Sequence, residues 1–234
     1  MSAEVAGLQV EQRGDGVLAL WLDRRAVHNA LDRVLVTALQ EAFATPGVRA
    51  FVLGSTDSRC FCAGADLSLS DSERAAVSDR LYELYRVMVC VPAPIVAAIE
   101  GPAIGGGAQL AIASDLRIGS PTARLRFPGP GHGLSVGAWA LPSLVGRGRA
   151  IDLCLTMRTV DAVEAAMMGL LDRLDADARR AACATAAAFA QLDPEASARV
   201  KAITREATGL LAALETERAG NATWSGSVEG LTRR

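Results

Sequence analysis

Two segments of this chain, residues 59–67 and 99–111, each lead from an apolar run through small residues into the start of a helical pattern. The first reads Arg-Cys-Phe-Cys-Ala-Gly-Ala-Asp-Leu and the second Ile-Glu-Gly-Pro-Ala-Ile-Gly-Gly-Gly-Ala-Gln-Leu-Ala. Small residues let a backbone approach a ligand closely, and a helix start favours negative charge. Two backbone N–H groups aimed at one oxygen form an oxyanion hole, which polarises a carbonyl group. The two segments therefore predict paired strand-to-helix turns that bind a carbonyl oxygen.

The remaining pattern predicts alternating strands and helices followed by a helical region. Strands are expected at residues 8–13, 17–23, 50–53, 95–99 and 116–118, with an extended piece near 125. Helices are expected at residues 31–43, from a cap at Asp71 or Ser72 to Pro92, and at 105–113, 139–145, 148–157, 160–169, 176–190 and 194–214. Strand–helix repeats followed by helices favour β-β-α units around a sheet with a helical layer added. The chain is therefore expected to form one domain with a helical appendage.

Composition narrows the class of protein further. The net charge of −2 argues against a nucleic-acid partner, because no basic excess is present to neutralise phosphates. No apolar run reaches the length of a membrane span, and the first residues lack the pattern of a signal peptide. The five cysteines are odd in number and lack the spacing of a disulfide framework, so we interpret them as reduced thiols. We therefore expect a cytoplasmic protein.

The wording and spacing of the two small-residue segments resemble the enoyl-CoA hydratase/isomerase (crotonase) family. The resemblance implies an α/β, crotonase-like β-β-α superhelix over residues 1–175. It also implies a C-terminal helical region, residues 176–234, that contributes to the acyl pocket and to oligomer contacts. The implied ligand is a coenzyme A thioester, with no further cofactor and no metal ion. The hole donors implied by the resemblance are the N–H groups of Ala65 and Gly106.

Further segments resemble the family's coenzyme A site. Residues 24–31 resemble its Arg-x-x-x-Asn-Ala-Leu element, where Arg24 and Arg25 would face phosphate; the alternative is that both are solvated surface arginines. The backbone there would lie along the pantetheine, and the first small-residue turn would flank the adenine and thioester ends. The implied coenzyme A contacts are Arg24, Arg25, Ala26, Val27, Ala63, Asp66 and Leu67. The implied acyl-pocket residues are Leu81, Leu84, Met88 and Trp139; for the first three a plain core role is favoured, and Trp139 is the better pocket candidate.

The sequence departs from the family at its acid and base positions. Active hydratases carry one glutamate two residues after the glycine triplet and a second in a Phe-x-x-Pro-Glu element. The matching residues here are Gln109 and Gly129, and no carboxylate occurs between Arg117 and Arg149. An amide can orient a water molecule, but it does not transfer a proton at neutral pH. The departure predicts little hydratase activity.

Two other side chains are candidates for an acid or base. The side chain of histidine has an ordinary pKa near neutrality, which makes His132 a candidate. A histidine that is merely hydrogen-bonded or exposed, without a catalytic role, is the favoured interpretation. Asp66 follows a hole donor, and a helix-start cap or ligand-orienting role is favoured for it over catalysis. Asp115 is expected to form a structural ion pair with Arg117.

The sequence therefore favours a protein of fatty-acid and lipid metabolism that binds an acyl-CoA or enoyl-CoA thioester, with the hole kept and the glutamates lost. The alternative is an active hydratase, isomerase or thioester hydrolase that uses another acid or base. A purely structural partner protein is the weakest hypothesis, because it would not need the hole segments. The oligomeric states common in the family further imply a homotrimer or homohexamer. Lipid-synthesis enzymes are candidate partners.

Overall fold

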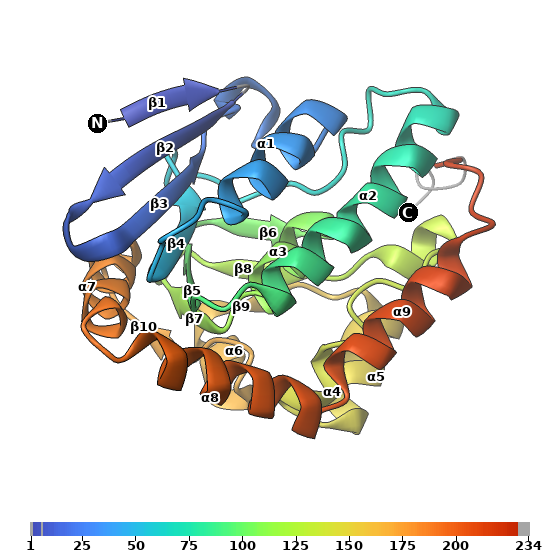
Figure 1. Cartoon of the computed structure of the whole chain (residues 1–234). Helices are drawn as coiled ribbons and strands as arrows, with labels where there is room; N and C mark the ends of the chain where they lie inside the picture. The colour runs from blue at the N-terminus through green and yellow to red at the C-terminus, as the bar shows by residue number, and fades with distance from the viewer. Residues whose placement is uncertain (1, 6, 229–234) are drawn as a thin grey trace.

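The computed structural model describes residues 2–5 and 7–228, and in this part of the chain seven strands form the main sheet (Figure 1). The strand order is β1–β2–β3–β4–β5–β7–β10, antiparallel from β1 to β3 and parallel from β3 onward. The bounds are β1 Ser2–Val5, β2 Leu8–Arg13, β3 Val17–Leu22, β4 Ala50–Ser55, β5 Ile95–Ile99, β7 Leu116–Gly119 and β10 Arg173–Leu174. The predicted strands at 8–13, 17–23, 50–53, 95–99 and 116–118 are therefore confirmed.

Helices cover both faces of this sheet. Their bounds are α1 Arg33–Phe43, α2 Asp71–Cys90, α3 Gly106–Ala113, α4 Leu141–Val145, α5 Arg147–Thr156, α6 Ala162–Met168, α7 Ala178–Ala190, α8 Pro194–Ala207 and α9 Leu210–Asn221. Alternate residues of β3 divide between the two faces, because successive side chains of a strand point in opposite directions. Leu18, Leu20 and Leu22 join the main core with α1 and α2. Val17 and Ala19 join a second core under α7.

Helix α7 packs on the sheet through a stripe of alanines. Ala178, Ala182, Ala186 and Ala190 are fully buried, at the four-residue spacing of one helix face. Figure 1 shows α7 on the other side of the sheet from α1 and α2. The family resemblance implies oligomer contacts within residues 176–234. The four alanines of that region pack against the chain's own sheet.

A second, three-stranded sheet leads into the first turn of α3. It joins β6 (Pro102–Ile104), β8 (Arg124–Arg126) and β9 (Val160–Asp161). Gly101 separates β5 from β6 with φ +68°, and a Cβ there would lie 2.5 Å from the Arg59 carbonyl oxygen. Only glycine fits this turn without strain. The chain thus leaves the main sheet directly into the segment that carries the glycine triplet.

Several helix boundaries differ from the sequence prediction, most of them by one or two residues, and two of the differences have a clear local cause. The predicted helix at 194–214 is two helices, because Gly209 adopts a left-handed conformation with φ +62° and α9 then continues to Asn221. The cap of α2 is Ser70 rather than Asp71 or Ser72. Its side chain accepts from the Glu73 N–H, and the Glu73 carboxylate accepts in return from the Ser70 N–H, which forms a capping box.

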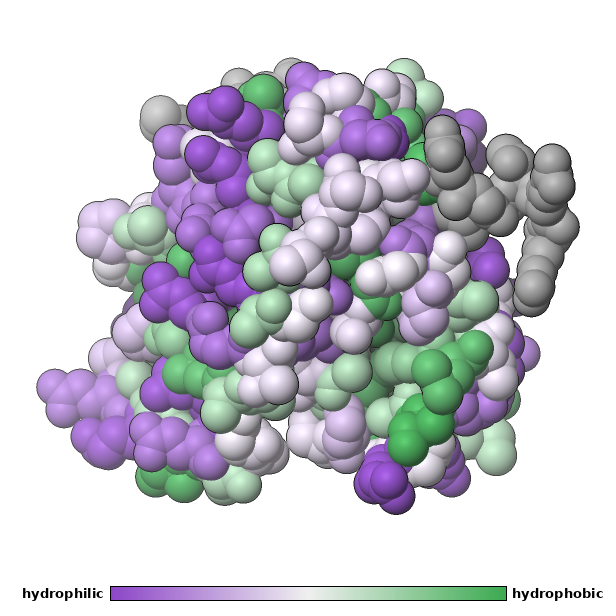
Figure 2. Space-filling model, turned by 90° about the vertical axis from the view of Figure 1, so that its right-hand side faces the viewer, coloured by the Kyte–Doolittle hydropathy of each residue, from purple (hydrophilic) through white to green (hydrophobic). Residues whose placement is uncertain are grey.

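The surface of the described part is mixed in character. On the face that Figure 2 shows, hydrophilic and hydrophobic residues are interspersed rather than segregated. Of the helices in the described part, none is both long and apolar enough to cross a bilayer.

Candidate functional site

The two small-residue segments lie side by side. Isolated β-bridges pair Leu31 with Ala65 and Cys62 with Ala103. Gly64 has φ +93°, and a Cβ there would lie 2.7 Å from the Ile104 carbonyl oxygen and 3.3 Å from the Gly106 nitrogen. This close approach requires glycine. The turn before residue 65 is thereby held against the start of α3, as the sequence predicts.

The two expected hole donors are unpaired. Among hydrogen bonds between described residues, none has the Ala65 or the Gly106 N–H as its donor. The N–H of the next residue, Asp66, is used: it donates to the Leu31 carbonyl at 3.0 Å. Gly106 is the first residue of α3, where helical N–H groups have no partner within the helix. Both residues are partly exposed.

Gln109 is buried on α3 and its amide has a fixed orientation. Its Oε1 atom accepts from Trp139 Nε1 at 2.8 Å and from the Gly137 N–H at 3.3 Å. Both partners can donate but cannot accept, so the oxygen rather than the nitrogen must face them. Gln109 therefore serves as an acceptor toward Trp139 and Gly137.

Gly129 has no room for a side chain. It begins the 3-10 turn at residues 129–132 and is buried. A Cβ there would lie 2.5 Å from Val136 Cγ2 and 2.7 Å from the Leu134 carbonyl oxygen. A glutamate cannot be placed at this position unless the loop moves.

A carboxylate that the sequence analysis missed lies beside Gln109. Glu217, on α9, is 6% exposed. Its Oε1 accepts from Tyr82 Oη at 2.8 Å and from the Gly137 N–H at 3.1 Å, and its Oε2 accepts from the Trp139 N–H at 2.9 Å. The Gly137 N–H is thus shared between Glu217 and Gln109.

The helical spacing that places Glu217 on a buried face is present in the sequence. It was missed because the predicted helix ends at residue 214, before Glu217. Leu210, Leu214, Glu217 and Asn221 fall on one face of α9 at helical spacing, so the glutamate continues an apolar stripe. Burial raises the pKa of Glu217 to about 7, against the lowering effect of its hydrogen bonds. A buried acidic residue on a core-facing stripe is an unusual feature.

The structure pairs both candidate phosphate-binding arginines with carboxylates. Arg24 lies 3.0 Å from Asp32 and 3.5 Å from Asp66, and it also donates to the Ala30 carbonyl. Arg25 lies 2.9 Å from Asp23 and is mostly exposed. A phosphate group would have to compete with these carboxylates for either guanidinium.

Neither candidate acid or base from the sequence is hydrogen-bonded to Gln109 in the described part of the chain. Asp66 accepts from the Ser68 hydroxyl and N–H, and these hydrogen bonds lower its pKa. Asp66 therefore anchors its own turn as an ionised group. Burial, with a contribution from Arg126, lowers the pKa of His132, and its carbonyl accepts from Trp224 Nε1. The Gln109 Oε1 atom accepts from Trp139 and Gly137.

The expected acyl-pocket residues divide into two groups. Leu81 lies against the hole, because a Cβ on Gly106 would be 3.2 Å from its Cδ1. Trp139 stacks on Tyr85 with ring centroids 6.2 Å apart, and the Tyr85 hydroxyl donates to the Gly106 carbonyl. Leu84 and Met88 are fully buried in the main core. The expected coenzyme A contacts Ala26, Val27 and Leu67 are exposed, and Ala63 is half-buried.

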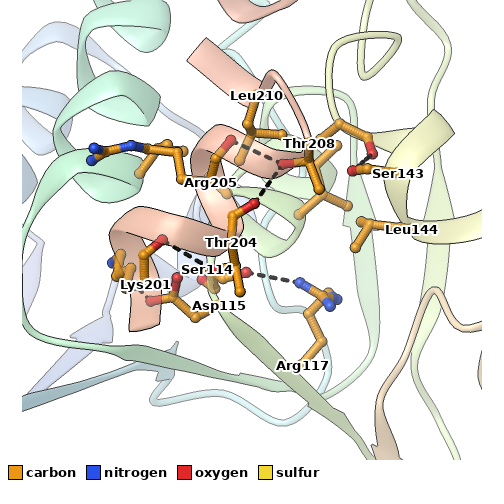
Figure 3. Close-up of a pocket in the computed structure, with 14 residues that line it drawn as sticks. Ser114, Asp115, Arg117, Ser143, Leu144, Lys201, Thr204, Arg205, Thr208 and Leu210 are labelled. Atoms are coloured by element: carbon orange, nitrogen blue, oxygen red, sulfur yellow. Dashed lines mark hydrogen bonds and ion pairs between the residues drawn. The ribbon is translucent and has the colours of Figure 1, made fainter. Parts of the chain in front are cut away.

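A separate cavity of about 180 Å³ lies between α8 and the start of β7 (Figure 3). None of the predicted site residues lines it.

The predicted ion pair of Asp115 has a different partner. Asp115 lies 2.7 Å from Lys201, whereas Arg117 lies 2.7 Å from Asp172. The expected Asp115–Arg117 ion pair is therefore wrong, because α8 supplies a closer cation.

Known proteins resemble this chain in sequence and in structure. Residues 12–228 match the sequence pattern of the enoyl-CoA hydratase/isomerase family. The probable enoyl-CoA hydratase echA6 of Mycobacterium leprae is 41% identical over 174 residues, which cover 70% of this chain and 70% of that protein. The protein of the same name from Mycobacterium bovis is 40% identical over 199 residues, which cover 82% and 79%. The crystal structure of an enoyl-CoA hydratase from Mycobacterium avium subsp. paratuberculosis superimposes with a TM-score of 0.85 at 28% identity, covering 98% of this chain and 95% of that one. The predicted crotonase-like α/β fold with C-terminal helices is thereby confirmed.

Proposed function

Since the chain belongs to the enoyl-CoA hydratase/isomerase family, we propose that it binds acyl-CoA or enoyl-CoA thioesters and hydrates them poorly. In this proposal the thioester oxygen accepts from the N–H groups of Ala65 and Gly106. The observation that carries it is the pair of adjacent, unpaired N–H groups beside a glutamine whose amide is tied to Trp139. A polarised thioester would be held there with no motif glutamate to activate water.

The loss of both glutamates supports binding over turnover. General acid and base groups each contribute roughly a hundred- to ten-thousand-fold to rate. Gln109 cannot supply such a group, and Gly129 has no space for one. The coenzyme A portion would extend over the exposed residues Val27 and Leu67. A role in fatty-acid and lipid metabolism, in which the protein holds acyl-CoA for other enzymes, is part of this proposal.

The hole can be tested with two variants of one residue. Gly106→Pro removes the N–H, whereas Gly106→Ala adds a comparable Cβ and keeps it. The Cβ would meet Leu81, Leu31 and the Tyr85 hydroxyl at 3.2–3.4 Å in either case, so the alanine variant controls for the contacts of the Cβ atom. We expect hexanoyl-CoA to bind the alanine variant far more tightly than the proline variant, as measured by calorimetric titration. Equal affinities would exclude the Gly106 N–H as a ligand donor.

A second candidate function is an enzyme that uses a single acid or base, and Glu217 favours it. A carboxyl with a pKa of about 7 is suited to proton transfer at neutral pH. Such an enzyme would turn over an enoyl-CoA at an ordinary rate, on the order of 10 per second. Glu217→Gln would abolish this turnover, and Glu215→Gln, an exposed position on the same helix, would not.

A further inference from the structure

We infer that Glu217 is a positioning residue of the proposed thioester site. Its carboxylate holds the turn at residues 137–139 and, through Trp139, fixes the Gln109 amide and the first turn of α3. Helix α9 is then part of the ligand site, although none of its residues belongs to the small-residue segments. This inference rests on the proposed function and adds a condition to it: the ionised carboxylate is the form that binds ligand.

The carboxylate holds the turn at two points. One oxygen accepts from the Gly137 N–H and the other from the Trp139 N–H, at 3.1 and 2.9 Å. The Tyr82 hydroxyl, from α2, adds a third hydrogen bond at 2.8 Å. Asn221, one helical turn further along α9, reinforces the arrangement, since its Nδ2 donates to Tyr82 Oη at 2.7 Å. Helices α2 and α9 thus fix the turn from one side.

Two routes connect this turn with the hole. Trp139 Nε1 donates to Gln109 Oε1 at 2.8 Å, and Gln109 lies on the same helix as Gly106. The Trp139 ring also stacks on Tyr85 at an interplanar angle of 16°. The Tyr85 hydroxyl donates to the Gly106 carbonyl at 3.0 Å. Any displacement of Trp139 therefore reaches the Gly106 peptide through two sets of contacts.

Within residues 2–5 and 7–228, no cation forms an ion pair with Glu217. The titratable groups that face it are Tyr82 and Tyr85 of α2 and Cys154 of α5, and its charge contributes to raising the pKa of each. The neighbouring Arg218 pairs with two carboxylates of α2 instead. A carboxylate in this position depends on N–H and O–H donors alone, which is costly unless they are well placed.

Protonation would weaken this arrangement. An ionised carboxylate is purely an acceptor, whereas a protonated one carries an O–H that must itself find an acceptor. The protonated oxygen is then a poorer acceptor for the N–H group that faces it, and the Tyr82 hydroxyl could turn its own proton to the Ser135 carbonyl, 3.1 Å away. Burial brings the pKa of Glu217 to about 7, so both forms are accessible near neutral pH. The same three hydrogen bonds occupy most of the carboxylate's acceptor sites, which favours holding the turn over transferring a proton.

The test is the pH profile of hexanoyl-CoA binding, measured by calorimetry from about pH 6 to about pH 8. We expect affinity to rise with pH and to level off above a midpoint near 7. Glu217→Gln should bind roughly tenfold or more weakly at about pH 8 and lose this dependence, because the NH2 group of its amide would face an N–H donor where the carboxylate oxygen accepted. Glu215→Gln is the matched control and should keep the wild-type profile.

A second variant keeps the carboxylate and covers the case in which Glu217→Gln does not fold. Tyr82→Phe removes one donor that stabilises the ionised form, so the midpoint should move to higher pH. Two results would overturn the inference while leaving the proposed function intact. One is a wild-type hexanoyl-CoA affinity that does not change with pH. The other is a pH dependence that is the same in the wild type, Tyr82→Phe and Glu217→Gln. Absence of hexanoyl-CoA binding by the wild-type protein would overturn both.

Proton transfer is the competing outcome. In deuterated water, a base at this site would exchange the C2 protons of hexanoyl-CoA, as mass spectrometry can follow. If the wild type exchanges them and Glu217→Gln loses exchange at unchanged affinity, Glu217 is an acid/base group rather than a positioning residue. We expect no exchange above the rate in buffer.

Discussion

At the scale of the residue, Glu217 couples the stability of the fold to pH. Its pKa is about 7 in the folded protein, against 4.5 for an unperturbed glutamate. Between these values the folded state binds more protons than the unfolded chain, so this residue lowers stability as pH rises. The integrated effect is about 3 kcal/mol. Urea unfolding of wild type and Glu217→Gln at about pH 5 and about pH 8 should show the wild type losing more stability. The same loss in both would contradict the assignment.

Also at the scale of the residue, the packing around Gly129 limits whether a glutamate can be introduced at this position. A Cβ there would lie 2.5 Å from Val136 and 2.7 Å from the Leu134 carbonyl. Gly129→Ala should therefore destabilise the protein by about 1–3 kcal/mol, and Gly129→Glu by more. Gly148→Ala is the control, since nothing lies within 4 Å of its Cβ position on α5; it should be neutral or stabilising. Restoring the pair of glutamates by substitution at 109 and 129 alone is thus not expected to restore hydration. If Gly129→Glu folds normally, the loop is more adaptable than its packing indicates.

At the scale of the element, α7 depends on small side chains. Ala186 is fully buried in the core between α7 and the sheet, whereas Ala184 on the same helix is exposed. Ala186→Leu should cost about 1–3 kcal/mol by overpacking, and Ala184→Leu well under 1 kcal/mol. Denaturant midpoints of the two variants compare them directly. The opposite ranking would mean that the alanine stripe faces another surface.

At the scale of the element, the features that could be predicted from the sequence are those that depend on neighbouring residues in the chain. The hairpin before and after residues 14–16 and the two turns at Gly64 and Gly105 were predictable, because apolar runs and glycine requirements are local. The roles of Glu217 and Asp115 were not, because each depends on partners far along the chain: Tyr82 for one and Lys201 for the other. Gly209 splits α8 from α9, and a helical pattern alone does not show that break.

At the scale of the whole molecule, the proposed assembly is a trimer or hexamer. Helix α8 exposes Val200 and Ile203 at 63% and 67%, beside a groove lined by Phe189 and Leu192. Exposed apolar residues gathered beside a groove are typical of a surface that another chain covers. Sedimentation equilibrium at micromolar concentration should therefore give a mass of three or six chains. A monomer mass would contradict the proposed assembly without affecting the ligand site.

The claim that this fold binds a thioester but hydrates it poorly is tested most directly by one paired measurement on the wild-type protein. Crotonyl-CoA affinity and crotonyl-CoA hydration are determined on the same sample, by calorimetry and by loss of enoyl absorbance. We expect saturable binding with hydration at least about a hundredfold below an ordinary rate of ~10 per second, because no motif glutamate activates water. Saturable binding with hydration on the order of 10 per second would contradict the account and would require an acid or base elsewhere in the site.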